Sequence, residues 1–102
     1  MTKILLCCAA GMSTIMVVSK MKQAATTKGL DVDINAVGME EFDASLPGYD
    51  CVLLGPQIKY KLAEFKTKGD AAGKPVGVIN AMDYGMMKGD KILADALAML
   101  QA

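Results

Sequence analysis

Two adjacent cysteines, Cys7 and Cys8, end an apolar run and are followed by a short stretch with one glycine and two hydroxyl residues. A loop that leads from a strand into a helix points backbone N–H groups, and the positive end of the helix dipole, at one spot where anions bind. The same donors stabilise a thiolate, so they lower the pKa of a cysteine there and make it a nucleophile. Cys8 is therefore the candidate acceptor, and the candidate anion-binding loop consists of Ala9, Ala10, Gly11, Met12, Ser13 and Thr14.

The other two cysteines, Cys7 and Cys51, are expected to be buried. Alternate side chains of a strand face opposite sides of a sheet, so Cys7 should point into a layer covered by helices, and free cysteine is among the most buried residue types. An odd number of cysteines argues against a disulfide framework. Three cysteines without a histidine lack the paired spacing of a zinc site. We therefore expect neither a metal nor another cofactor.

The residues around Cys8 favour phosphoryl transfer over hydrolysis. Tyrosine phosphatases place an arginine at the end of the equivalent loop, where it clamps the transferring phosphoryl group with two hydrogen bonds. Thr14 stands at that position here, and the chain has no arginine and no histidine. A thiol that accepts phosphate, in a chain without these groups, is suited to passing the phosphate onward. The residues therefore predict a phosphoryl carrier.

Four runs of strand length, each followed by a helical pattern, make up most of the chain. Residues 3–8 form a continuous apolar run typical of a strand buried on both faces. Polar and apolar side chains alternate in residues 31–37, which is typical of a half-buried edge strand. Residues 51–54 and 76–79 are short apolar runs. Repeated strand–helix alternation predicts a parallel sheet with helices on both faces. The expected fold class is a doubly wound α/β fold, in a single domain of residues 1–102.

Helices are expected between and after these strands. The first should end at Gly29, a short one should lie near residues 40–46, a third should end at Gly69, and Asp90 should cap the last. Their apolar faces, spaced as a helix requires, are Ile15, Val18, Met21 and Ala25 in the first helix, Ile58, Leu62 and Phe65 in the third, and Ile92, Leu93, Ala96, Leu97 and Leu100 in the last.

The functional site of a doubly wound sheet lies at the carboxyl ends of the strands, where the strand order switches. Three loops should meet there, formed by residues 9–13, 55–58 and 80–87. Residues of the second and third loops are therefore expected beside Cys8.

Composition excludes several functions. The chain has 102 residues, 53% of them hydrophobic, which is enough for one ordinary core. Eleven basic and eleven acidic residues give a formal net charge of zero, which argues against the basic surface that nucleic-acid binding needs. No run approaches the roughly 20 apolar residues of a membrane span, and residues 4–10 are too short a run for a secretory signal. We expect a cytoplasmic protein that neither enters the membrane nor binds nucleic acid.

Three segments together resemble one known family. The motifs CAAGMST at residues 8–14, LLGPQIKY at residues 53–60 and DYG at residues 83–85 are similar to those of the IIB components of sugar phosphotransferase systems, of the lactose/cellobiose (chitobiose) type. The resemblance spans nearly the whole chain. It implies a four-stranded parallel sheet with strand order 2-1-3-4 and a phosphatase-like phosphate loop after the first strand.

The resemblance also implies the reaction. In this family the loop cysteine receives phosphate from a phosphohistidine on the IIA protein and passes it to a sugar bound by the membrane protein IIC during uptake. Carried over to this chain, Cys8 is the phosphocysteine intermediate and residues 9–14 form the phosphate loop. The sugar is expected to be a β-disaccharide.

Cys8 would then meet two partners in turn, so one surface around it should bind both. Methionine adapts to unlike surfaces, and apolar residues near the thiol keep water away from the transferring phosphate. We expect a partly exposed rim that both partners contact, formed by Met12, Ile58, Met82, Tyr84 and Met86.

Two other classes stay open on the residues alone. A relative of the low-molecular-weight phosphatases and arsenate reductases would be an enzyme acting alone, and it would turn over para-nitrophenyl phosphate. A receiver-like regulatory module would need an acidic residue at the carboxyl end of a strand, whereas Asp50 precedes its strand.

Overall fold

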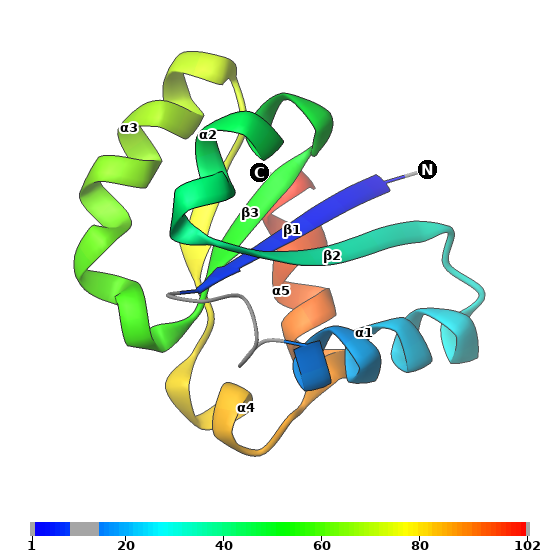
Figure 1. Ribbon diagram of the computed structural model, residues 1–102. Helices are drawn as coiled ribbons and strands as arrows, with labels where there is room; N and C mark the ends of the chain where they lie inside the picture. Colours follow the sequence, from blue (N-terminus) through cyan, green and yellow to red (C-terminus); the bar gives the residue numbers. More distant parts are fainter. Residues whose placement is uncertain (1, 9–14, 102) are drawn as a thin grey trace.

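Four parallel strands form the centre of the fold. The computed structural model describes residues 2–8 and 15–101, and its strands are β1 (Thr2–Cys8), β2 (Val32–Gly38), β3 (Cys51–Leu54) and β4 (Val76–Val78). Their order in the sheet is β2-β1-β3-β4, and every neighbouring pair is parallel. Figure 1 shows the sheet crossing the molecule between two groups of helices. The expected parallel sheet and its strand order are confirmed.

The central strand, β1, carries the most continuous apolar run. It pairs with β2 on one side and β3 on the other, and its residues from Ile4 to Cys8 are all buried. β2 is an edge strand, as expected, and Ile34 is its one fully buried residue. A continuous apolar run suits a strand covered on both faces, whereas alternation suits a half-covered edge. The bounds of all four strands fall within one residue of those expected from the sequence.

Helices α1 (Ile15–Lys28) and α5 (Gly89–Gln101) cover one face of the sheet (Figure 1). They approach closely where α5 begins, because a Cβ atom at Gly89 would lie 2.4 Å from the carbonyl carbon of Lys20. Only glycine fits there without moving a backbone. The buried side chains of this face are Ile4, Leu6, Val17, Val18, Met21, Ala25, Ile34, Cys51, Leu53, Ile79, Ile92, Leu93 and Ala96.

The apolar face of α1 differs from the expected one at its first residue. Val17, Val18, Met21 and Ala25 are buried, whereas Ile15 is 58% exposed. Each step along a helix turns the side chain by about 100°, so Ile15 and Val17 point in nearly opposite directions. The prediction that Ile15 belongs to the core was wrong, because a three-residue spacing to Val18 fits a helical stripe without showing where the stripe begins.

Helices α2 (Phe42–Ser45) and α3 (Leu62–Ala72) cover the other face, so the expected layer of helices on each face is confirmed. The rings of Phe42 and Phe65 stack there, with centroids 4.2 Å apart and planes 9° from parallel. The buried side chains of this face are Leu5, Cys7, Phe42, Leu46, Val52, Leu54, Ile58, Phe65 and Val76.

The segment before β3 contains three short helical turns where one short helix was expected near residues 40–46. They are the 3-10 turn η1 (Met39–Glu41), α2, and the 3-10 turn η2 (Leu46–Gly48). Phe42 and Leu46 anchor this segment in the core, and the proline in η2 stands where a 3-10 turn tolerates it. Burial of two side chains therefore determines its path more than helix propensity does.

The end of α3 also differs from the expected one. The helix passes Gly69 and ends at Ala72, with Gly73 in a left-handed conformation (φ 73°) as its cap. Gly69 serves close packing instead, because a Cβ atom there would lie 2.6 Å from the carbonyl oxygen of Lys74. In the sequence, either glycine could end the helix. The packing of the segment after the helix, which contains Lys74, against Gly69 shows that Gly73 is the cap.

A further helix, α4 (Ala81–Gly85), lies in the region expected to be a loop. The side-chain oxygen of Asn80 caps it by accepting hydrogen bonds from the backbone N–H groups of Met82 at 2.9 Å and Asp83 at 3.1 Å. α5 begins at Gly89, so Asp90 lies in its first turn and is not its cap. An acidic residue still stabilises that end of the helix through the dipole.

Candidate functional site

Cys8 is the last residue of β1 and lies at the carboxyl end of the central strand. Alternation along the strand puts it on the same face as Ile4 and Leu6, which pack against α1 and α5. Its residue surface is fully buried. The expected phosphate loop, residues 9–14, lies outside the described part of the chain, and so does Met12 of the expected rim.

The start of η3 (Pro56–Lys61) lies directly against Cys8. The Gly55 N–H donates a hydrogen bond of 2.7 Å to the carbonyl oxygen of Cys7, which ties the end of β3 to the end of β1. A Cβ atom at Gly55 would lie 3.4 Å from the Cβ of Cys8 and 2.5 Å from the side-chain oxygen Oε1 of Gln57. The second expected loop is therefore beside Cys8, as predicted.

The other two thiols are buried, as predicted, and the structure places them on opposite faces of the sheet. Burial raises the pKa of Cys7 to about 11, with smaller contributions from Cys8 and the negative charge of Glu41. Burial likewise raises the pKa of Cys51 to about 11, with a contribution from Asp50. The Cys51 thiol faces the carbonyl oxygen of Ala96 at 4.0 Å. Both thiols are protonated at neutral pH, so neither is a ready nucleophile.

The third expected loop is held in place from two sides. Asn80 caps α4 from one end. From the other, the Lys88 N–H donates to the Asp83 carbonyl oxygen at 2.9 Å, and Lys91 of α5 pairs with the Asp83 carboxylate at 3.6 Å. The Asp83 residue is only 9% exposed. Both Asn80 and Asp83 therefore fix the position of α4, and the sequence analysis assigned neither of them this role, although Asn before a short helix is a common cap.

The expected rim is exposed at only some of its members. Met82 on α4 and Met86 directly after it are 70% and 62% exposed, and Tyr84 is half-buried against the core on the face that α1 and α5 cover. Ile58 is 1% exposed, so the prediction that it lies on this surface was wrong. Its backbone leaves the helical region (φ −118°, ψ 26°), and its side chain belongs to the core on the face that α2 and α3 cover.

Two exposed apolar residues at the same end of the sheet were missed. Ile15 and Met16 open α1 and are 58% and 59% exposed. α1 follows β1 and α4 follows β4, and parallel strands end at the same edge of a sheet, so both helices begin at the edge where Cys8 lies (Figure 1). The sequence carries no clear signal for them, because helical spacing does not show where the buried stripe of α1 begins.

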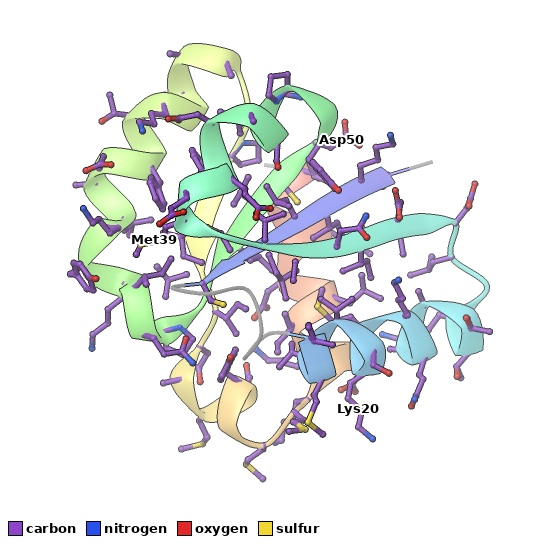
Figure 2. The ribbon with its side chains drawn as sticks, viewed as in Figure 1. Lys20, Met39 and Asp50 are labelled. Carbon is purple, nitrogen blue, oxygen red and sulfur yellow. The ribbon has the colours of Figure 1, made fainter. Side chains whose placement is uncertain are left out.

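Asp50 lies at the other edge of the sheet. Its carboxylate accepts a hydrogen bond of 2.7 Å from the backbone N–H of Lys3 near the start of β1. Figure 2 shows Asp50 and Met39 at opposite ends of the sheet, with Met39 just beyond the carboxyl end of β2. This placement does not favour a receiver-like module, which would need an acidic acceptor at the carboxyl edge.

Neither a metal cluster nor a membrane helix is found in residues 2–8 and 15–101. No group of three His, Cys, Asp or Glu side chains there could hold a metal ion. No helix in that part of the chain is long and apolar enough to cross a membrane.

The fold defines a class, the doubly wound parallel α/β domains, and Cys8 lies at the carboxyl edge of the sheet, where the functional sites of such domains are found. The family model for the lactose/cellobiose-specific IIB subunit of phosphotransferase systems matches residues 3–95. A galactose-specific EIIB component from Lactococcus lactis subsp. cremoris and a cellobiose-specific one from L. lactis subsp. lactis are each 47% identical over 98 residues, which is 91% of this chain and of theirs.

A solved structure agrees with these relatives. The cellobiose-specific phosphotransferase IIB component from Borrelia burgdorferi is 33% identical and superposes with a TM-score of 0.82, covering 98% of this chain and 92% of its own. The chain belongs to the lactose/cellobiose-specific IIB family of sugar phosphotransferase systems. It is a phosphoryl-transferring component of such a system, and the alternative of a phosphatase acting alone is not favoured.

Proposed function

We propose that Cys8 is the residue that carries the phosphoryl group, within a single IIB domain formed by residues 1–102. The observation that supports this most directly is the position of Cys8 at the carboxyl end of β1, against the start of η3. Cys7 and Cys51 are poor candidates, because burial raises the pKa of each to about 11. A protonated thiol is a weak nucleophile.

Two displacements at phosphorus complete one cycle. In the first, the Cys8 thiolate attacks a phosphohistidine on a IIA protein; an S–P bond forms, the N–P bond breaks, and its electron pair stays on the imidazole nitrogen. In the second, a sugar hydroxyl held by the membrane protein IIC attacks phosphorus. An O–P bond forms, the S–P bond breaks to regenerate the thiolate, and the hydroxyl proton is released to solvent. Residues 9–14 would form the phosphate loop in both steps.

The exposed apolar residues near Cys8 support one binding surface for both partners. Four residues are each more than half exposed and lie at the edge of the sheet that holds Cys8: Ile15 and Met16 on α1, Met82 on α4, and Met86 directly after α4. Tyr84 lies between Met82 and Met86 in the sequence and is half-buried. Because both partners must reach the same sulfur, their complexes should be mutually exclusive, and this surface should act on the cytoplasmic side of the membrane.

The sugar is a separate part of the proposal. The two Lactococcus relatives are equally similar to this chain, and one is named for galactose and the other for cellobiose. Cellobiose is a β-disaccharide, so the second relative supports the expected substrate class. Uptake and phosphorylation of a panel of labelled sugars, with this chain as the IIB component, would identify the sugar, and a preference for monosaccharides would contradict this part.

Labelling from phosphoenolpyruvate tests the main proposal. The chain is incubated with the general relay proteins and candidate IIA partners, and the phosphorylated residue is mapped by mass spectrometry. We expect one phosphoryl group on Cys8. Label on a serine, a threonine or an aspartate in the wild-type protein would overturn the proposal.

A further inference from the structure

The side-chain amide of Gln57 lies against Gly55, in the neighbourhood of Cys8. Its oxygen Oε1 lies 2.5 Å from the place that a Cβ atom of Gly55 would occupy, and the Cβ of Cys8 lies 3.4 Å from the same point. The separation between the Gln57 amide and Cys8 Cβ is therefore no greater than the sum of these two distances. The S–P and P–O bonds of a phosphoryl group on the Cys8 sulfur are long enough for its oxygens to cover this separation.

The backbone on both sides of Gln57 is held. Pro56 before it has a restricted φ, and Ile58 after it is 1% exposed in the core. The Ile58 N–H donates a hydrogen bond of 3.0 Å to the Gly55 carbonyl oxygen and closes the turn around Gln57. Gln57 itself is exposed. A residue with a fixed backbone and an accessible amide can meet a ligand without a large loss of entropy.

The glycine at position 55 is explained by this arrangement and not by its backbone. Gly55 has φ −63° and ψ 150°, an extended conformation that any residue adopts. A Cβ atom there would displace the flexible end of the Gln57 side chain and would itself come into van der Waals contact with Cys8. Gly55 therefore keeps open the space in which these two side chains approach each other.

The amide of Gln57 could supply a hydrogen-bond donor that a phosphoryl group on Cys8 needs. A phosphoryl group carries negative charge that needs hydrogen-bond donors, and the chain has neither arginine nor histidine to supply them. Rotation of a glutamine amide by 180° exchanges its oxygen for an NH2 group with little change of shape. A neutral donor also binds the anion more weakly than a guanidinium would, which suits a group that must leave again.

We propose that the side-chain NH2 of Gln57 donates a hydrogen bond to the phosphoryl group on Cys8 and holds it for transfer. The inference rests on the proposed role of Cys8 and adds a residue outside the 9–14 segment.

Three variants and a control test it. Gln57→Met keeps the length of the side chain without the donor, Gln57→Glu keeps its shape but adds negative charge, and Gly55→Ala keeps the glutamine but displaces it. Gln23→Met changes another exposed glutamine, on α1. We expect phosphoryl transfer from phosphorylated IIA to slow roughly 10- to 100-fold in Gln57→Met, at least as much in Gln57→Glu, and less in Gly55→Ala. Gln23→Met should behave as wild type, and thermal unfolding should show that all four variants fold.

A spectroscopic measurement separates this role from a structural one. In a 15N-labelled protein, phosphorylation of Cys8 should shift the side-chain NH2 signals of Gln57 and leave those of Gln23 unchanged. The shift should shrink in Gly55→Ala. If Cys8 is phosphorylated but these signals do not move, and Gln57→Met transfers phosphate within twofold of the wild-type rate, the inference is wrong while the carrier function stands. If wild-type Cys8 takes up no phosphate, the proposed function fails first.

Discussion

Gly55, directly after β3, lies beside Cys8 at the end of β1: a Cβ atom built at Gly55 would lie 3.4 Å from the Cβ of Cys8. The hydrogen bond from the Gly55 N–H to the Cys7 carbonyl oxygen, at 2.7 Å, holds the two strand ends in this position. Cys8, the proposed acceptor, and the segment that begins η3 are therefore held side by side, although Gly55 follows Cys8 by 47 positions in the sequence.

Serine substitution should distinguish the three thiols. We expect Cys8→Ser to abolish phosphate acceptance and transfer to sugar, because a serine hydroxyl is far less ionised than a thiol at neutral pH. Cys7→Ser and Cys51→Ser should transfer phosphate normally but lose about 1–3 kcal/mol of stability, since each buries a hydroxyl in an apolar layer. Transfer assays and urea unfolding on the three variants check this, and normal transfer by Cys8→Ser would contradict it.

Stability should fall in alkaline solution because of the two buried thiols. In the unfolded chain Cys7 and Cys51 ionise near their ordinary pKa of 9.0, whereas in the folded protein the pKa of each is raised to about 11. Between these values the unfolded chain has lost protons that the folded protein keeps, so the free energy of unfolding decreases as pH rises, by up to about 3 kcal/mol per thiol.

Urea unfolding at several pH values from 7.5 to 11 measures this decline. Cys51→Ala should be less stable than wild type at pH 7.5 but should show a shallower decline as pH rises, since one of the two thiols is gone. An identical slope in the variant and the wild-type protein would show that ionisation of Cys51 does not contribute.

The close approach of α5 to α1 predicts a large effect at one glycine. In Gly89→Ala the new methyl group would lie 2.4 Å from the Lys20 carbonyl carbon and 2.6 Å from the Met21 nitrogen, so one helix must move. We expect a loss of about 3 kcal/mol. Gly85→Ala is the matched control, because nothing lies within 4 Å of its Cβ position, and its stability should change by less than about 1 kcal/mol. Equal effects in thermal unfolding would contradict the contact.

A charge on the exposed surface of α4 should weaken both partner encounters. Met82 is 70% exposed, so Met82→Asp should fold normally, but a carboxylate desolvated in an interface is costly. We expect transfer from IIA and transfer to sugar each to slow about tenfold. Leu30→Asp, at a 40% exposed residue after the far end of α1, should leave both rates unchanged. Slowing of only one of the two steps would show that the partners use different surfaces.

Local sequence signals were sufficient for the strands and for the candidate acceptor. A continuous apolar run and an alternating one specify a central and an edge strand, since side-chain direction follows directly from strand geometry. Cys8 was singled out because it ends such a strand and precedes glycine and hydroxyl residues. Residues 53–60 were recognised as a motif, but nothing local showed that the amide of Gln57 and the space at Gly55 face Cys8.

Contacts between distant segments decided the remaining features. Gly69 and Gly73 both suit a helix end, and only the chain returning through Lys74 and Val76 makes Gly69 a packing site and leaves Gly73 to cap the helix. Ile15 fits a helical stripe by spacing but lies off the buried one. Ile58 turns into the core because its backbone departs from the helix. In each case several conformations satisfy the local rules, and burial against residues far away in the chain selects one of them.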